Sequence, residues 1–426
     1  MSVSLIVLAA LMAVPIVFLR ADWAGWLILY ATFALVPLTL PFHRRRKLIL
    51  AIWGTLVVHH LVAIANAYFT AVLGAGADAA AFHRNATTIS MIGGWDFGIG
   101  ARFYTTALAS AYSIVGPSNF FGAETSIFAY TLSCIVLVRM LDLLKIERHQ
   151  MACVLIFGLH PAALLFGGTT LREAWQVLFF MQSVYCLLRF RQNARPDALF
   201  WGVSSALMMG WLHNGLIVYA LILVPYALFS RLGIRSSPSL QRVLGICLTG
   251  TVAAGLAAAI LTGSLPHAPT LKALAAGDAL DYAANYRQGG HEARTDYGVM
   301  LDASSPAAFA MSLPLAYVYY MLAPFPWQIR TALDAFAALD AWFSIALLFF
   351  AFKGWRSLPP GNLSRTYRFL IVLYFLMSLL WSMGTSNYGT AIRHHLVPMW
   401  ILIVLGIPPL FDRMIGAGRE PAPSAD

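Results

Sequence analysis

Charged residues are scarce in this sequence. Asp, Glu, Lys and Arg make up 11% of the 426 residues, whereas soluble domains carry roughly 25%. Hydrophobic residues make up 60%, and the mean hydropathy is +0.72. A chain of this length cannot bury so much apolar surface in one water-soluble core. The composition therefore excludes a soluble fold and indicates lipid as the solvent of much of the chain.

Several sequence motifs are also missing. No HExxH, GxSxG, phosphate-binding loop or dinucleotide-binding GxGxxG occurs in its proper context, which argues against a membrane metalloprotease or a nucleotide-driven pump. The four cysteines lie in apolar stretches without CxxC spacing, so neither a metal site nor a disulfide framework is predicted. The net charge of +10 does not indicate a nucleic-acid partner, because the basic residues form short clusters between apolar runs.

Apolar runs of about 20 residues, the length that crosses a hydrocarbon core of about 30 Å, recur along the chain. We predict an all-α, polytopic integral membrane protein with about 12 transmembrane helices. The first run is interpreted as a retained helix, because it lacks the basic start and cleavage site of a signal peptide. The predicted spans are 4–20, 23–42, 47–72, 124–143, 150–167, 171–190, 199–212, 214–230, 243–262, 331–352, 367–384 and 394–411.

The basic clusters predict the orientation of these spans. Nineteen of the 28 basic residues fall in alternate connections, which the positive-inside rule assigns to the cytoplasm, together with both termini. We expect one domain at 1–411, with outer-face segments 73–123 and 263–330, and a disordered cytoplasmic tail at 412–426. Segment 307–324 would reverse the sidedness of the following basic loop if it spanned, so it is predicted to be re-entrant or interfacial.

The first outer segment contains Asp78 in GADAAAFHRNA, ahead of an expected interfacial helix at 101–115. Asp78 follows the third span, where a partly desolvated carboxylate suits a general base. An Asp before an Ala run also suits a helix N-cap, and the pattern leaves both interpretations open. His83, Arg84 and Asp96 extend this polar cluster as candidate substrate contacts.

Three candidate contacts lie near other span ends. Arg172 and Glu173 open the sixth span, where charges need a partner or a wet cavity. An interfacial pair with Glu173 at the helix N-terminus explains them equally well. His213 separates two short spans, and its ring suits either a substrate or an interhelical hydrogen bond.

Asn387, Arg393 and His394 open the last span in TSNYGTAIRHH. The planar guanidinium suits a phosphate or diphosphate, and an Arg that snorkels to the interface is the alternative. The second outer segment mixes Tyr, Arg, His and acidic residues, as sugar sites and solvated loops both do. We expect its 275–300 portion to be a mobile lid that orders over substrate.

This pattern resembles the glycosyltransferase C superfamily of polytopic enzymes that use polyprenyl-linked sugars, and most of all its bacterial exopolysaccharide and O-antigen members. The resemblance implies a catalytic base at Asp78 and a contact from Arg393 to the lipid phosphate. Many relatives have paired acids where this chain has Asp78-Ala79, so metal dependence stays open and no cofactor is expected. The matching stretches are GADAAAFHRNA, FYTTALASAYSIVGPSN, Pro161 to LRE, PFPWQ and NYGTAIRHH.

The sequence therefore predicts an inner-membrane glycosyltransferase. It would transfer a sugar from a polyprenyl-(di)phosphate donor to a glycan or lipid acceptor on the outer face, with Arg393 and Arg172 stabilising the leaving phosphate. One alternative is a polymerase that joins lipid-linked repeats. Another is a lipid-linked-sugar flippase or transporter, which should place polar residues near the middle of the membrane.

Overall fold

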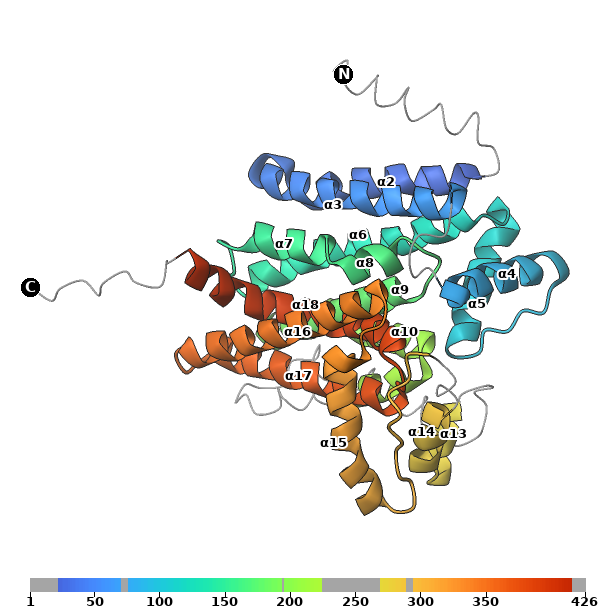
Figure 1. Ribbon diagram of the computed structural model, residues 1–426. Coiled ribbons are helices and arrows are strands. Elements are labelled where there is room, and N and C mark those ends of the chain that lie inside the picture. The colour runs from blue at the N-terminus through green and yellow to red at the C-terminus, as the bar shows by residue number, and fades with distance from the viewer. Residues whose placement is uncertain (1–21, 70–75, 194, 224–268, 289–293, 416–426) are drawn as a thin grey trace, which may run out of the picture. The chain divides into compact units, whose positions relative to one another are not determined.

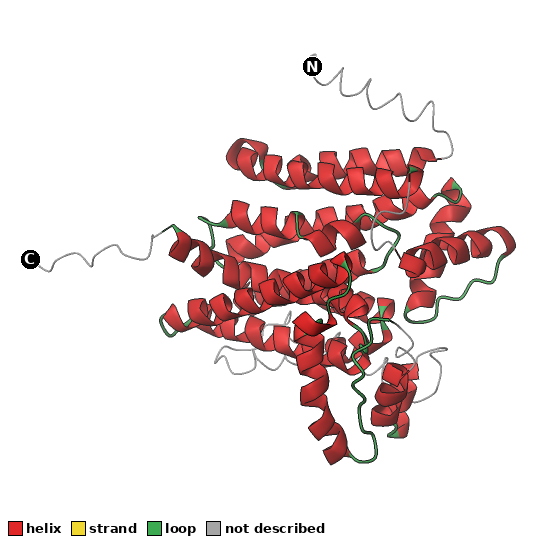
Figure 2. Ribbon diagram, viewed as in Figure 1, coloured by secondary structure: helices red, strands yellow, loops and turns green. Residues whose placement is uncertain are grey.

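The computed structural model describes residues 22–69, 76–193, 195–223, 269–288 and 294–415. Every regular element in these ranges is a helix (Figures 1 and 2), which confirms the predicted all-α class. The chain divides into two compact units. Unit 1 comprises Met1–Leu137 and Gly158–Ala279, and unit 2 comprises Val138–Phe157 and Leu280–Asp426.

Five of the described helices are long and apolar enough to cross a bilayer, so the chain is a helical membrane protein. Each of them coincides with a predicted span to within a few residues. The five helices are Arg45–Tyr68, Asn119–Leu143, Ala332–Ser357, Asn362–Gly384 and Tyr388–Met414.

The remaining predicted spans have mixed outcomes. A bent pair, α7 (Gln150–Gly158) and α8 (Pro161–Gly167), replaces the straight span predicted at 150–167 and counts as a sixth candidate if it crosses as one. Pro161 accounts for the break, because proline disfavours a helical residue before it. Two predicted spans, 4–20 and 243–262, lie outside the described residues. The described part of the chain therefore does not reach the predicted count of about 12 spans.

Three helical hairpins build the described part of unit 1. The first is α2 (Trp23–Thr39) with α3 (Phe42–Tyr68), the second is α4 (Gly76–Ile92) with α5 (Ala101–Val115), and the third pairs α9 and α10. The helix predicted at 101–115 is thus confirmed as α5. In Figure 1, α4 and α5 lie side by side and are joined by the extended loop 93–100.

The third hairpin consists of α9 (Glu173–Asn193) and α10 (Pro196–Leu212), and α8 connects it to α3. The predicted break at His213 is confirmed. α10 ends at Leu212, His213 has extended backbone angles, and the short 3-10 helix η2 (Asn214–Leu216) follows. The other long helix that enters this unit is α6 (Asn119–Leu143), which continues into unit 2.

Unit 2 is organised around α16 (Ala332–Ser357), α17 (Asn362–Gly384) and α18 (Tyr388–Met414). The backbones of α16 and α18 approach closely, because a Cβ added to Gly406 would lie 2.5 Å from the carbonyl oxygen of Leu347. Small residues permit such approaches between membrane helices. α18 runs on to Met414, so the first residues of the predicted disordered tail are helical.

The helix α15 (Pro306–Leu322) runs steeply across the direction shared by α16, α17 and α18 (Figure 1) and packs against all three. Tyr320 is buried, whereas Met311 and Leu315 are exposed. The helix is apolar but has only 17 residues, fewer than the five candidate spans. Whether 307–324 is re-entrant or interfacial stays a prediction.

Candidate functional site

The α4–α5 hairpin encloses a pocket of about 550 Å³. On α4, the lining residues Asp78, Phe82, Asn85 and Ile89 have the spacing that places residues on one face of a helix. Its α5 wall and the connecting loop supply further polar groups. The lining residues are Asp78, Ala81, Phe82, Asn85, Thr88, Ile89, Gly94, Asp96, Ala101, Arg102, Thr105 and Thr106.

Two carboxylates line this pocket in different surroundings. Asp78 lies in the first turn of α4 and is exposed, where a negative charge is favoured by the helix dipole. It is inside the helix, not at its N-cap, and it is less desolvated than the sequence predicted. Asp96 is fixed by a 2.9 Å ion pair with Arg102 and by a 2.9 Å hydrogen bond from the backbone N–H of Gly98.

His83 and Arg84 do not line the pocket. The hydroxyl of Tyr112 donates to the carbonyl oxygen of Ser118 at 2.9 Å, so Nδ1 of His83, 2.8 Å from that hydroxyl, is the donor in their hydrogen bond. Burial, and secondly the charge of Arg84, lowers the pKa of His83. Arg84 is exposed. His83 therefore joins α4 to α5, a structural role that the sequence did not predict.

Arg172 and Glu173 lie behind the pocket wall. The guanidinium of Arg172 lies 5.9 Å from the ring centroid of Phe82, and its Nη1 donates to the carbonyl oxygen of Leu212 at 3.0 Å. Glu173 is buried in the first turn of α9. Burial raises the pKa of the neighbouring Tyr104; the charge of Glu173 adds to this rise and that of Arg172 opposes it. Arg172 thus holds the end of α10 through Nη1, and its role at a leaving phosphate stays a prediction.

The end of α10 also holds the hairpin loop. The backbone N–H of Gly100 donates to the carbonyl oxygen of Trp211 at 2.8 Å. Gly100 has φ of +88°, and a Cβ there would lie 3.4 Å from Oδ1 of Asn214. Nδ1 of His213 accepts from the backbone N–H of Gly215 at 3.2 Å. The described contact of His213 is therefore a cap on the following turn, and its role as a substrate contact stays a prediction.

A second polar group lies in unit 2 at the start of α18. Asn387 is the N-cap of α18, and its Oδ1 accepts from the backbone N–H of Thr390 at 2.8 Å. An isolated β-bridge pairs it with Asp296 in the loop before α15. Asn387, predicted as a substrate contact, is thus a capping residue whose backbone anchors the loop before α15.

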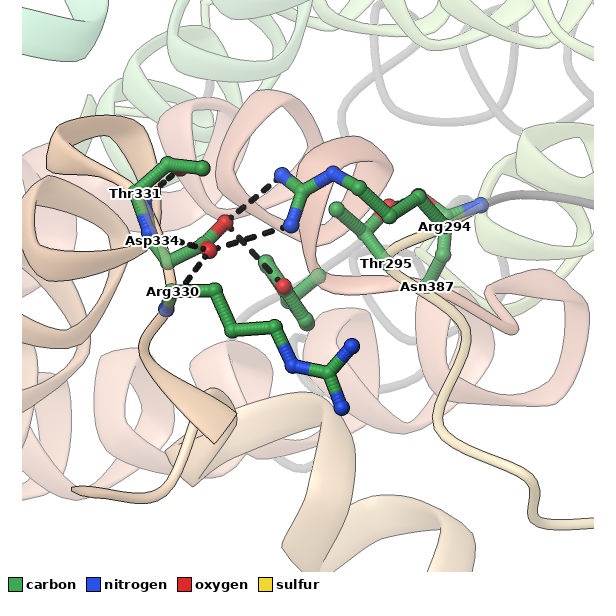
Figure 3. Close-up of polar contacts among 7 residues, drawn as sticks. Arg294, Thr295, Arg330, Thr331, Asp334 and Asn387 are labelled. Atoms are coloured by element: carbon green, nitrogen blue, oxygen red, sulfur yellow. Dashed lines mark hydrogen bonds and ion pairs between the residues drawn. The ribbon is translucent and has the colours of Figure 1, made fainter. Parts of the chain in front are cut away.

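Asp334 is the centre of this group (Figure 3). Its carboxylate accepts two hydrogen bonds from the guanidinium of Arg294, at 2.8 and 3.1 Å, and one from the hydroxyl of Tyr388 at 3.0 Å. The backbone N–H groups of Arg330 and Thr331 donate to it at 3.0 and 2.9 Å. The guanidinium of Arg330 points away from the carboxylate. The pairing with Asp334 raises the pKa of Arg294.

Arg393 and His394 lie in the second turn of α18, and both are half-buried. Nδ1 of His394 lies 2.8 Å from Oγ1 of Thr385, and its ring stacks on Trp381 with a centroid distance of 3.7 Å. Both contacts come from α17 and the residue after it, so they hold the ring of His394 against the end of α17. Because these residues belong to unit 2 and Asp78 to unit 1, their meeting at one substrate stays a prediction.

Part of the lid predicted at 275–300 is held in place by the hydrogen bonds of one buried arginine. Arg287 is buried, and its guanidinium donates to the carbonyl oxygens of Val299, Ser382 and Thr385 at 2.8, 2.5 and 2.6 Å. Burial lowers the pKa of Arg287. Residues 289–293 of the predicted lid lie outside the described residues. Arg287 serves as a tie to the end of α17, where the sequence suggested a sugar contact.

Among the residues that the structure describes, no three His, Cys, Asp or Glu side chains gather as metal ligands. The chain matches no protein-family model, and neither a curated protein nor a solved structure matches it significantly. Any assignment of function therefore depends on the chain's own residues.

Proposed function

We propose that this chain is a membrane glycosyltransferase that moves a sugar from a polyprenyl phosphate or diphosphate to a glycan or lipid acceptor. The single observation that carries the proposal is the pocket of the α4–α5 hairpin, which has a rim carboxylate at Asp78 and a second, fixed carboxylate at Asp96. A transferase to a hydroxyl needs one group to accept a proton and others to orient the sugar. Asn85, Thr88 and Arg102 offer the orienting groups.

The surroundings of the pocket suit a lipid-linked donor. Met91, Ile92, Trp95, Phe97 and Ile114 are exposed apolar residues of the same hairpin and its loop. Aromatic and aliphatic side chains of this kind favour the boundary between lipid and water. A polyprenyl-linked sugar has its phosphate at the same depth. The proposal places this hairpin on the outer face of the inner membrane, with about 12 spans and both termini in the cytoplasm.

In the proposed step, Asp78 takes the proton of an acceptor hydroxyl as that oxygen forms its bond to the anomeric carbon. The bond between the anomeric carbon and the phosphate oxygen breaks, and the polyprenyl phosphate or diphosphate leaves with the electron pair. Arg393 is the proposed cation for that developing charge, because a guanidinium binds phosphate oxygens in a planar fork. Arg172 is left out of this role, since its Nη1 donates to Leu212.

The test is transfer from a lipid-linked donor in membranes, normalised to inserted protein. Asp78→Asn should lower the rate by about 10²–10⁴-fold, the contribution of a general base. Asp302→Asn is the matched control: this exposed carboxylate accepts from the backbone N–H of Ser304 within its own loop, so normal transfer is expected. If Asp78→Asn keeps most of the activity, the catalytic assignment is wrong. The length of the glycan product distinguishes single-sugar transfer from the joining of repeats.

A transporter of lipid-linked sugars is the second candidate, because polar side chains are buried inside the helices of unit 1. Thr32, His60 and Glu124 are each at most 3% exposed, and ionisable residues inside membrane helices commonly mark transport pathways. Vesicles that hold labelled lipid-linked sugar on one side decide between the two. Movement of the label across the bilayer without formation of a glycosidic bond would favour transport.

A further inference from the structure

Three helices of unit 1 each bring one polar side chain to a single buried cluster. Nε2 of His60, on α3, lies 3.0 Å from Oγ1 of Thr32 on α2. Nδ1 of the same ring lies 3.1 and 2.9 Å from the two carboxyl oxygens of Glu124 on α6. Thr32 and Glu124 are 0% exposed, and His60 is 3% exposed. This cluster plays no part in the proposed sugar transfer.

The hydrogen-bond directions fix how many protons the cluster holds. The hydroxyl of Thr32 donates to the carbonyl oxygen of Leu29 at 2.6 Å, so its oxygen can only accept from Nε2–H of His60. With Nε2 protonated, a neutral His60 presents a lone pair at Nδ1. Glu124 must then be a carboxylic acid that donates to Nδ1, or the proton must have moved to His60 to form an ion pair. In both forms one proton lies between Glu124 and His60.

The neutral form is favoured inside a bilayer, because separating charge in a low-dielectric medium is costly. A structural bond between membrane helices needs only Ser, Thr, Asn, Gln or His. An ionisable carboxyl at such a site is expensive, and such groups usually serve ions or protons. The choice of Glu124 as the partner of His60 therefore points to proton binding.

The titratable groups around the cluster indicate the route by which a proton enters and leaves it. His59, the next residue on α3, has its Nε2 2.9 Å from the carbonyl oxygen of Gly158 and its ring against Tyr130, so it belongs to a separate contact. Tyr68, at the end of α3, packs its ring on Phe120, one helical turn before Glu124 on α6, with a centroid distance of 5.5 Å. Its hydroxyl donates to the carboxylate of Asp22 at 2.8 Å.

We propose that Thr32, His60 and Glu124 form an intramembrane proton-binding site, which holds one exchangeable proton and communicates with the surface through Tyr68 and Asp22. In uptake, a proton from water adds to the Glu124 carboxylate; in release, the same O–H bond breaks and the proton returns to water. Movement of the proton from Glu124 to Nδ1 of His60 changes no net charge. Thr32 keeps the ring in the tautomer that leaves Nδ1 able to accept.

Infrared difference spectroscopy of the full chain in lipid nanodiscs tests this site. The wild type should show the carbonyl stretch of a protonated carboxyl, and transfer to D₂O should shift the band while the helices stay folded. Glu124→Gln should lose the band. Its amide N–H can still donate to Nδ1 of His60, so the helices should stay packed. His59→Gln, a change of the adjacent histidine, should leave the band and its exchange unchanged.

The route is tested by Tyr68→Phe, which should slow the D₂O shift without removing the band. Three results would overturn the proposal: no protonated-carboxyl band in the wild type, a band that survives Glu124→Gln, or a band that exchanges only on unfolding. That last result would mean that Glu124 and His60 form only a structural hydrogen bond. If Glu124→Gln does not insert, the carboxyl band is assigned with isotope-labelled glutamate instead. The labelled wild type is compared with labelled Glu173→Gln, because Glu173 is also buried.

Discussion

Arg294 and Asp334 form a two-pronged ion pair, with Nη2 to Oδ1 at 2.8 Å and Nη1 to Oδ2 at 3.1 Å. The two side chains differ in exposure: that of Arg294 is 51% exposed and that of Asp334 is 1% exposed. The exposed cation comes from the loop before α15 and the buried carboxylate from the first turn of α16. The pair therefore ties the loop before α15 to α16, one of the candidate membrane-spanning helices of unit 2.

The first prediction follows from this tie. Asp334→Asn removes the charge but keeps an oxygen for the backbone N–H groups of Arg330 and Thr331, so α16 should still begin at the same residue. Arg294 should become free, and trypsin should cleave after it several-fold faster in the folded protein. Asp302→Asn, in the same loop but away from Arg294, should leave the cleavage rate unchanged. Equal cleavage of both variants would show that the pair does not restrain the loop.

The second prediction concerns the contact between α16 and α18. Gly406→Ala places a methyl group 2.5 Å from the carbonyl oxygen of Leu347 and should cost about 1–3 kcal/mol through overpacking. Gly54→Ala is its control, because a Cβ at this helical glycine meets nothing within 4 Å. That change should stabilise by about 0.5–1 kcal/mol through lower backbone entropy of the unfolded chain. Thermal unfolding of the wild type and both variants is measured in one detergent. A Tm for Gly406→Ala at or above the wild-type value would contradict the close packing of α16 against α18.

The third prediction is a pH dependence of the α4–α5 hairpin. The pKa of His83 is lowered from its ordinary value of 6.5 by burial and by Arg84, so the unfolded chain takes up the proton at a higher pH than the folded hairpin. Stability should therefore fall as the pH drops from about 7.5 to about 5.5. Hydrogen exchange of α4 and α5 measures it. His83→Gln, which can still donate to Tyr112, should flatten the dependence; an unchanged slope would assign it to another group.

The fourth prediction is the sidedness of the hairpin. Thr88→Cys should react with an impermeant thiol reagent added from outside, because Thr88 is exposed and lines the pocket. Asn362→Cys, exposed at the start of α17 in a predicted cytoplasmic connection, should react only after permeabilisation. Cys134, Cys153 and Cys186 are buried, so a background with Cys247→Ser should be nearly silent. Labelling of Thr88→Cys only after permeabilisation would place the pocket inside the cell.

Much of the helical framework could be predicted because one local property decides it. A membrane helix needs an apolar run of sufficient length, and the runs at 124–143, 331–352, 367–384 and 394–411 each correspond to a long helix. The break at His213 was also predictable, since one helix through it would exceed the width of a bilayer. The bend at Pro161 was missed because the apolar run continues through it.

The pocket was only partly predictable. Asp78 and Asp96 were selected as neighbours in sequence, but the helical repeat that adds Asn85 to Asp78 was overlooked. The ties of Arg287 were not predictable, because two of its three carbonyl partners, Ser382 and Thr385, are distant in the sequence. Glu124 carried a usable signal, a lone acid in an apolar run, but only the packing of α6 against α3 shows that it meets His60.

The carbonyl oxygens at the end of α10 hold the hairpin loop and Arg172 through residues that do not line the pocket. The carbonyl oxygen of Trp211 accepts from the backbone N–H of Gly100, and that of Leu212 accepts from the side chain of Arg172. The residues that line the pocket on α4 and α5 are different ones. If the chain is the proposed glycosyltransferase, substitutions in the pocket wall would change the accepted sugar without disturbing the contacts between the hairpin loop and the end of α10. Related chains would then diverge in substrate before they diverge in architecture.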